Sequence, residues 1–405
     1  MDTRAYLITS GLLLTALGCR DVTDAPTEPS SASPQANLST TSTLAFWQLS
    51  AGGHHTCGVT TDDQAYCWGL SGSGQLGTTD GLEECGHGGG TCGPRPLPVA
   101  GGLRFRQVSA GWGHTCGITM DYLAYCWGLN WTGNLGDGTQ LDRSAPILVA
   151  GSLRFRQIDA GQYHTCARSY PENYVYCWGQ NNKGQLGDGT TTNRSRPVRV
   201  LGSRQFRQVS VGDYHTCGVT SADQAFCWGW NHRAQLGDST QVGRRARPTL
   251  VAGGHLFRQV DAGHDVTCAV TTEDRAFCWG DGRYGQLGNG QTYLSFWPRA
   301  VAGGLSFRRV TAGGFHVCGE TTTDRAYCWG GNIAGGLGTG TLDNSTKPVA
   351  AGGGLRFGQL SAGRTHTCGK TTAETGYCWG ENSWGQLGDA TSIHRLVPTP
   401  VVAPT

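Results

Sequence analysis

The chain has 405 residues, among them 65 glycines, 15 prolines, 17 cysteines and two methionines, and its formal charge is +2. The glycine-rich composition favours short strands joined by tight turns, so we expect almost no helix. Charges of both signs are scattered along the sequence without a basic field, which excludes nucleic acid as an expected partner.

The first 19 residues are typical of an export signal. Arg4 precedes an apolar run from Ala5 to Leu17 that is too short to span a bilayer. The stretch 16–19 resembles a bacterial lipobox, in which the cysteine, here Cys19, is lipidated and becomes the mature N-terminus. We predict a lipoprotein-type signal peptide over 1–19, with ordinary secretion as the alternative. The expected location is the bacterial cell-envelope surface or the exterior, with a lipid anchor as the only attachment to a membrane.

Residues 20–43 are dominated by Ser, Thr, Pro, Ala and Asp and contain almost no large apolar side chain. Such a segment cannot bury enough apolar surface to fold. We predict a disordered tether there, and one repeat domain over residues 44–405.

The domain repeats a unit typified by residues 114–128, which run from His-Thr-Cys to Cys-Trp-Gly. Seven copies occur, and after the first, which carries an insertion over 78–95, they follow at steps of 50 or 51 residues. A period of this length indicates a solenoid or a propeller. The second unit has extended segments at 103–110, 114–119, 123–128 and 145–149. Four strands in each of seven units predict an all-β, seven-bladed propeller.

The two cysteines of each unit set the register of its middle hairpin. If Cys116 opposes Cys126, residues 120–122 form a hairpin loop of common length, and the two Cβ atoms come within disulfide range. So many oxidisable pairs indicate an exported protein, whereas a zinc clip would need a spacing of two to four residues. We predict one disulfide in each blade and one in the insertion, from Cys57, Cys67, Cys85, Cys92, Cys116, Cys126, Cys166, Cys177, Cys217, Cys227, Cys268, Cys278, Cys318, Cys328, Cys368 and Cys378.

Two further positions recur in the units. The tryptophan after the second cysteine alternates with it across the strand, which predicts core packing against a neighbouring blade. A histidine occupies the turn before the first cysteine in six units, and Val266 replaces it in the other. A ring of imidazoles suggests a metal, but Val266 breaks the ring, and a side-chain bond to backbone across the turn is the preferred interpretation of a position that belongs to the repeat signature. We expect neither metal nor cofactor.

Because successive strands alternate in direction, the Gly-x-x-His turns and the loops after Trp-Gly should emerge at one end of the propeller. Residues that vary between near-identical units are not needed to maintain the fold, so they can serve binding. Aromatic residues and arginines are typical of interaction hot spots. The alternative is that they only shield loop backbone. We predict binding residues at this end, namely Trp112, Tyr163, Tyr214, Phe315, Trp131, Trp230, Arg233, Arg283, Tyr284, Arg364 and Trp384, with His54, Lys183 and Asp265 beside them.

Four short motifs of the second unit carry a family likeness, namely Ser109-Ala110-Gly111, His114-Thr115-Cys116, Tyr125-Cys126-Trp127-Gly128 and Gly133-Asn134-Leu135-Gly136. With these motifs, the repeat resembles that of the regulator of chromosome condensation family over residues 44–402. The resemblance implies a seven-bladed propeller, and it implies nucleotide exchange on a small GTPase as an alternative activity. The cysteine-rich version here is similar to an exported bacterial branch.

No catalytic motif with a known mechanism is present, and Asp213 and Asp265 are the places to look for paired carboxylates. We therefore predict a non-enzymatic, monomeric interaction module that binds a macromolecule, protein rather than carbohydrate, through one end face. The alternatives are a regulator of a GTPase, a secreted enzyme inhibitor and a carbohydrate-binding propeller.

Overall fold

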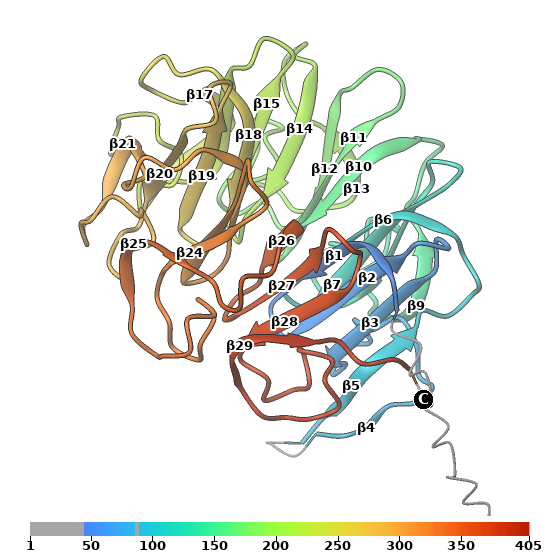
Figure 1. Cartoon of the computed structure of the whole chain (residues 1–405). Coiled ribbons are helices and arrows are strands. Elements are labelled where there is room, and N and C mark those ends of the chain that lie inside the picture. The colour runs from blue at the N-terminus through green and yellow to red at the C-terminus, as the bar shows by residue number, and fades with distance from the viewer. Residues whose placement is uncertain (1–43, 86–88, 405) are drawn as a thin grey trace, which may run out of the picture. The chain divides into compact units, whose positions relative to one another are not determined.

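The computed structural model describes residues 44–85 and 89–404. These residues form seven antiparallel sheets, the blades, each built from strands that are consecutive in the chain (Figure 1). Six blades have four strands, and the first has a fifth. The all-β propeller predicted from the repeats is therefore confirmed. The predicted signal over 1–19, Cys19 and the tether over 20–43 lie outside the described residues.

In six blades the strands run from the axis outwards in chain order, and in the first blade the order is β1-β2-β3-β5-β4. The innermost strands are β1 (Phe46–Ala51), β6 (Phe105–Ala110), β10 (Phe155–Ala160), β14 (Phe206–Val211), β18 (Phe257–Ala262), β22 (Phe307–Ala312) and β26 (Phe357–Ala362). The second strands are β2 (His55–Thr60), β7 (His114–Thr119), β11 (His164–Ser169), β15 (His215–Thr220), β19 (Val266–Thr271), β23 (His316–Thr321) and β27 (His366–Thr371). The third strands are β3 (Ala65–Leu70), β8 (Ala124–Gly128), β12 (Val175–Gly179), β16 (Ala225–Trp230), β20 (Ala276–Gly280), β24 (Ala326–Gly330) and β28 (Gly376–Gly380). The outer strands are β5 (Thr91–Pro98), β9 (Arg143–Leu148), β13 (Arg194–Arg199), β17 (Arg244–Leu250), β21 (Ser295–Ala300), β25 (Ser345–Ala350) and β29 (Arg395–Pro400).

The insertion in the first unit adds a strand to the outer edge of its blade. Strand β4 (Glu83–Glu84) pairs with β5, and Cys85 is bonded to Cys92. In all seven blades the second and third strands bring their cysteines directly opposite each other, with Cα atoms 4.0 to 4.1 Å apart. The predicted pairing of all sixteen cysteines is confirmed.

The core lies between blades, because each blade buries its cysteine face against the tryptophan face of the next. Cys116 and Cys126 of the second blade pack in one cluster with Phe155 and Trp178 of the third. The indole of Trp178 is fully buried, and its Nε1 donates to the carbonyl of Asn134, 3.0 Å away in the preceding blade. The tryptophan therefore has the core role predicted for it.

The histidine of each turn also bonds to the next blade, so the expected bond to backbone across the turn was wrong. The Nε2 atom of His164 lies 2.8 Å from the Thr216 hydroxyl, which itself donates to the carbonyl of Gln185. The hydroxyl must therefore accept from an Nε2–H tautomer. Burial lowers the pKa of His164 to about 3, so the imidazole is neutral. The bonded pairs are His55 with Thr115, His114 with Thr165, His164 with Thr216, His215 with Thr267, His316 with Thr367 and His366 with Thr56.

The blade that lacks the turn histidine is followed by a blade that lacks the threonine partner. Val266 replaces the histidine in the fifth blade, and Val317 stands in the sixth blade where the threonine partner belongs. Both valines are buried in one apolar cluster. A polar pair has thus been exchanged for an apolar pair, which avoids leaving one buried polar group without a partner.

Near the axis, the glycine of each Ala-Gly turn allows the blades to approach closely. A Cβ atom on Gly161 would lie 2.2 Å from the carbonyl oxygen of Gly212, and the other six turn glycines would meet the next blade's carbonyl at 2.2 to 2.5 Å. A side chain at any of these positions would collide with main chain, which cannot move without opening the ring. Glycine is required here by space rather than by its φ angle.

The seventh blade closes the ring against the first, and β26–β28 in red lie beside β1–β3 in blue (Figure 1). The contacts at this junction are those of the other junctions. Gln359 Nε2 donates to the carbonyl of Leu49 at 2.9 Å, and His366 bonds to Thr56 at 2.9 Å. Closure therefore uses side-by-side packing, and among the strands of residues 44–85 and 89–404 none is exchanged between blades. Within the part of the chain that the structure describes, no helix has the length and hydropathy needed to cross a membrane.

Candidate interaction face at the axial mouth

The Gly-x-x-His turns and the loops that follow Trp-Gly meet at one end of the propeller, which we call the turn end. The amide of Leu129, just after Trp127-Gly128, donates to the carbonyl of Gly113 at 2.9 Å. The hairpins between second and third strands emerge at the opposite end, the hairpin end. There the amide of Phe155 bonds to the carbonyl of Tyr122 at 2.8 Å. All eleven predicted binding residues belong to the loops of the turn end.

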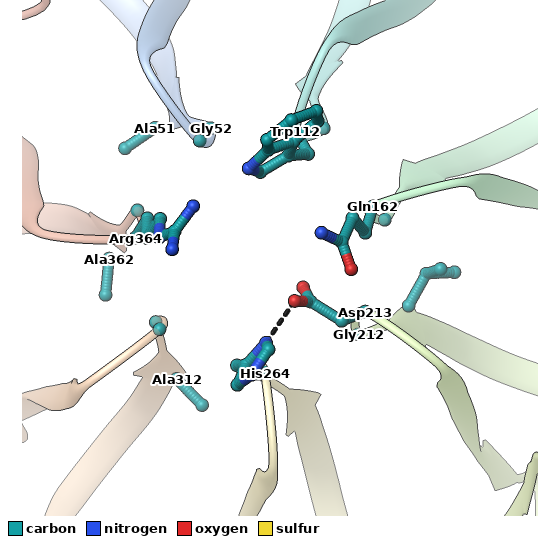
Figure 2. Close-up of a pocket in the computed structure, with 18 of the residues that line it drawn as sticks. Ala51, Gly52, Trp112, Gln162, Gly212, Asp213, His264, Ala312, Ala362 and Arg364 are labelled. Carbon is teal, nitrogen blue, oxygen red and sulfur yellow. Dashed lines mark hydrogen bonds and ion pairs between the residues drawn. The ribbon is translucent and has the colours of Figure 1, made fainter. Parts of the chain in front are cut away.

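The residue directly after Ala-Gly in each turn surrounds the mouth of the axial channel. This axial ring comprises Gly53, Trp112, Gln162, Asp213, His264, Gly314 and Arg364. Figure 2 shows the side chains of Trp112, Gln162, Asp213, His264 and Arg364 around an open centre. The mouth encloses about 140 Å³.

Main-chain bonds hold the ring in place. The amide of Trp112 donates to the carbonyl of Gly161 at 3.1 Å, and Arg364 donates to Gly52 in the same way at 3.1 Å across the closure. Because the backbone is bonded to its neighbours, the side chains of the axial ring are not needed to close the structure. They are available for contact.

An ion pair at the rim of the mouth joins two neighbouring members of the axial ring, one from the fourth blade and one from the fifth. His264 Nδ1 contacts a carboxylate oxygen of Asp213 (Figure 2). Its Nε2 lies 3.5 Å from Asp265 Oδ2. Burial acts to lower the pKa of His264, but the hydrogen bond and charge of Asp213 outweigh it and raise this pKa to about 9. The imidazole is therefore protonated at neutral pH, and it stands between two acidic groups.

An arc of aromatic rings continues outwards from the mouth over five blades. The aromatic arc comprises Trp384, His54, Trp112, Tyr163, Trp131, Tyr214 and Trp230. Successive ring centroids are 5.3 to 6.3 Å apart, from Tyr214–Trp230 at the short end to His54–Trp384 at the long end. Lys183 Nζ lies 5.3 Å from the ring of Trp230. Trp131 is 59% exposed, so the arc is open to a partner.

The other predicted residues are not part of this series of rings. Phe315 lines the mouth and pairs with Tyr284, with ring centroids 5.8 Å apart. Arg364 lies at the mouth, in the axial ring. Arg283 is tied to Asp281 of its own loop at 2.6 Å, so its charge is already balanced, while Arg233 contributes its backbone amide to Gln235 at 2.8 Å.

Sequence reasoning missed Gln162 and His264, and it considered Asp213 only as a possible catalytic carboxylate. The prediction took one residue from each turn. Some of these residues stand directly after Ala-Gly and others stand one position later, so two structurally different positions were combined. The signal that could have found the ring is the first position alone, which reads Gly, Trp, Gln, Asp, His, Gly, Arg in the seven units. The structure assigns the first position to the axial ring, whereas the second position contributes His54, Tyr163 and Tyr214 to the arc.

Seven contiguous blades with repeated Gly-x-x-His and Cys-Trp-Gly signatures define a repeat-built β-propeller. The chain belongs to the RCC1-like domain family, whose model matches residues 13–306. The model of the regulator of chromosome condensation (RCC1) repeat also matches residues 323–369. The resemblance read from the repeat is thereby confirmed.

Two curated relatives share part of the chain. The ultraviolet-B receptor UVR8 of Arabidopsis thaliana is 29% identical over 257 residues, which is 62% of this chain and 57% of the receptor. The human E3 ubiquitin-protein ligase HERC2 is 30% identical over 252 residues, which is 60% of this chain and 5% of the ligase. The match spans a little over half of one relative and a small part of the other.

Solved structures share the fold at lower identity. Human WBSCR16 superposes with a TM-score of 0.75 at 22% identity, over 84% of this chain and 94% of that chain. Yeast RCC1 (Prp20), solved with Kap60 bound, superposes with a TM-score of 0.72 at 18% identity, over 89% and 85% of the two chains. At such identities the likeness concerns architecture alone.

Proposed function

We propose that this protein is a non-catalytic interaction module that binds a protein partner through the aromatic arc and the axial mouth. The observation that carries the proposal is the continuity of the arc. Its rings lie at positions that the repeat leaves free, and they touch one another in an unbroken series beside an open mouth.

The composition of the arc favours a protein over other partners. Trp, Tyr and Arg carry most of the binding energy in protein interfaces, since they bury a large area at low cost in side-chain entropy. The mouth adds charges of both signs, with Asp213 and Asp265 beside His264 and with Arg364 also in the ring. Mixed charge beside aromatic anchors suits a folded protein or a peptide. Yeast RCC1, a neighbour of the same fold, has been solved with a protein, Kap60, bound to it.

We place the module outside the cytosol, lipid-anchored through Cys19 or secreted, as a monomer. All sixteen cysteines of the described residues are paired in disulfides, a state that persists in oxidising compartments. A GTPase regulator, the activity implied by family resemblance, would have to work in the cytosol, where such bonds are reduced. Fractionation with lipid labelling tests the location, and a protein found in the cytosol with free thiols would overturn it.

A triple substitution tests the binding face. Trp112→Ala, Tyr214→Ala and Trp384→Ala together remove three members of the arc while leaving the main-chain ring in place. A photo-crosslinker at position 131 should capture a defined partner with the native chain and lose it with the triple variant. The matched control is Trp297→Ala, which removes an aromatic of 44% exposure from outer strand β21. Capture that survives the triple variant, or that the control abolishes equally, would refute the proposed face. Exclusive binding to a glycan array would replace protein by carbohydrate as the partner.

A further inference from the structure

At the hairpin end, the inner strands of five blades carry an arginine at the same β-bulge, between the Phe and the residue that resumes pairing. A bulged residue is displaced from the ladder, and its side chain is redirected. In three blades the guanidinium is balanced by an aspartate of the same blade's hairpin. The pairs are Arg207 with Asp223 at 2.6 Å, Arg258 with Asp274, and Arg308 with Asp324 at 2.6 Å.

The second and third blades have the arginine without the aspartate. Tyr122 and Asn173 occupy the acidic position, so Arg106 and Arg156 have no carboxylate partner among the described residues. Arg106 lies 4.4 Å above the ring of Tyr122, and Arg156 lies 4.7 Å above that of Tyr170. The two tyrosine rings stack on each other with centroids 4.3 Å apart at an angle of 6°.

Four flat groups therefore form one stack across the junction of two blades, with a guanidinium at each end. Stacking fixes the plane of a guanidinium through its face and leaves the N–H groups at its edge unused. Neither guanidinium donates a hydrogen bond within residues 44–85 and 89–404, and the Nε atom of Arg156 is buried without a partner.

A third arginine adds to the positive charge. Arg168 in β11 pairs across the strands with Gln157, next to Arg156, at a position that holds valine or isoleucine in four other blades. Its Nη1 donates to Asn173 Oδ1 at 3.0 Å, and its Nε is buried without a partner in the described chain. Burial and, to a lesser extent, the charge of Arg156 lower the pKa of Arg168 to about 10. The side chain is still protonated at neutral pH, so like charges are held together without compensation.

We infer that Arg156 and Arg168, at the third-blade end of the stack, form a binding site for a tetrahedral oxyanion, a phosphate or sulfate group, free or carried by a larger molecule. Such an anion accepts several N–H bonds at once, and the fixed donor fork of arginine matches its geometry. The anion would supply the negative charge that Asp223, Asp274 and Asp324 supply in the other blades. The acidic residues of these two hairpins, Asp121 and Glu172, form no salt bridge with the arginines within the described residues. The site lies at the opposite end from the aromatic arc and does not depend on the proposed function.

Phosphorus NMR of inorganic phosphate tests the site directly. With the full chain at fixed ionic strength, the phosphate resonance should broaden on addition of protein and should sharpen again when sulfate is added in excess. A thermal shift alone would not suffice, because sulfate and phosphate stabilise most proteins by exclusion from their surface.

Two variants and a control locate the binding. Arg156→Gln should weaken phosphate binding about tenfold, the loss expected for removing a charged hydrogen-bond donor. Asn173→Asp gives the third blade the carboxylate that the fourth, fifth and sixth possess, and it should weaken binding by a similar factor through internal neutralisation of Arg156. The matched control is Arg258→Gln, because its guanidinium is already paired with Asp274 and should not contribute.

Circular dichroism and the thermal midpoint confirm that each variant is folded. Absence of broadening with the native chain, or an equal loss in Arg258→Gln, would overturn the inference. Flotation with vesicles of anionic phospholipid, and of phosphatidylcholine as reference, then distinguishes the sources. Flotation that depends on Arg156 assigns the anion to a lipid headgroup, and phosphate binding without flotation assigns it to a soluble ion or ester.

Discussion

Trp127 and Trp131 lie four residues apart, yet they belong to regions that follow different rules. Trp127 is fully buried between blades, donates to the carbonyl of Gln75, and has a counterpart in every unit. Trp131 is 59% exposed at the turn end and has no such series of counterparts. The interior is a set of bonds repeated around the axis, whereas the turn end carries residues that the repeat does not need.

The same division runs through each five-residue turn. Glycine and histidine are fixed by contact with the next blade, the first through close approach and the second through its threonine. The two residues between them differ from unit to unit; the first forms the axial ring, and the second supplies three rings of the aromatic arc, His54, Tyr163 and Tyr214. A scaffold that completes its own hydrogen bonds can vary its surface without losing stability, which explains how one repeat serves both purposes.

The pair of tryptophans offers the largest contrast. Trp127→Ala should lower the free energy of unfolding by about 3 to 5 kcal/mol, because it leaves a cavity between blades. Trp131→Ala should change it by no more than about 0.5 kcal/mol, as surface substitutions do. Denaturant unfolding of both variants measures the difference. A large cost for Trp131→Ala would place that residue in the scaffold and weaken the case for a binding role.

The glycine ring should be nearly as sensitive. Gly161→Ala puts a methyl group 2.2 Å from the Gly212 carbonyl, and relief requires two blades to separate, so we expect a loss of about 3 kcal/mol in unfolding free energy. Gly243→Ala is the control, because a Cβ atom there has no neighbour within 4 Å. Thermal melts of the two variants should differ clearly. Equal midpoints would mean that close approach of the blades does not require glycine.

At the junction between the fifth and sixth blades, two substitutions could introduce the histidine–threonine hydrogen bond found at the other junctions. Val266→His alone should cost about 2 kcal/mol, because it buries an imidazole opposite Val317 with no acceptor. Adding Val317→Thr supplies the hydroxyl used at the other six junctions and should recover about 1 kcal/mol. A double-mutant cycle by chemical unfolding measures the coupling. Additive effects of the two substitutions would show that the histidine does not depend on its threonine.

Most of what could be predicted from the sequence was local to one blade, although the alternation of Trp127 with Cys126 also indicated packing against a neighbouring blade. Cys116 and Cys126 set the hairpin register because side chains alternate along a strand, so strands, disulfides and the parity of the loops followed. The partner of His164 could not be predicted, since Thr216 belongs to the next blade and meets it only when the ring closes. The stack of Tyr122 on Tyr170 joins hairpins of two blades for the same reason. Contacts between blades depend on how sheets pack, and the repeat period alone does not specify that.

The channel contains a smaller asymmetry that pH should reveal. In each inner strand, one side chain accepts a hydrogen bond from a backbone amide of the next blade's inner strand. The accepting residue is a serine or threonine in five blades and an aspartate, Asp159 or Asp261, in the other two. Asp261 Oδ1 lies 2.8 Å from the amide of Ala312, the contact that Ser210 makes with Ala262 at 3.0 Å. Both aspartates line a cavity of about 660 Å³ within the channel. The repeat thus shows that a hydroxyl suffices where these two blades place a carboxyl group.

Burial raises the pKa of Asp261 to about 8, with a further contribution from the charge of Asp159, while the hydrogen bond from Ala312 opposes the rise. A carboxyl whose pKa is higher in the folded state binds more protons there than when unfolded, so stability falls as the pH rises from the unfolded pKa of about 4 towards 8.

Asp261→Ser should remove that slope and stabilise the protein at pH 8 by about 1 kcal/mol, a modest gain because a channel of this size has room for water around the carboxylate. At pH 4 the variant and the native chain should unfold at nearly the same denaturant concentration, since the carboxyl is then protonated in the folded state and half protonated in the unfolded state, so little of the penalty remains. Ser210→Ala serves as control, because it removes the same acceptor without a titrating group and its cost should not depend on pH. A native chain whose stability does not change between pH 4 and 8 would show that the carboxylate of Asp261 is as well solvated in the channel as in the unfolded chain.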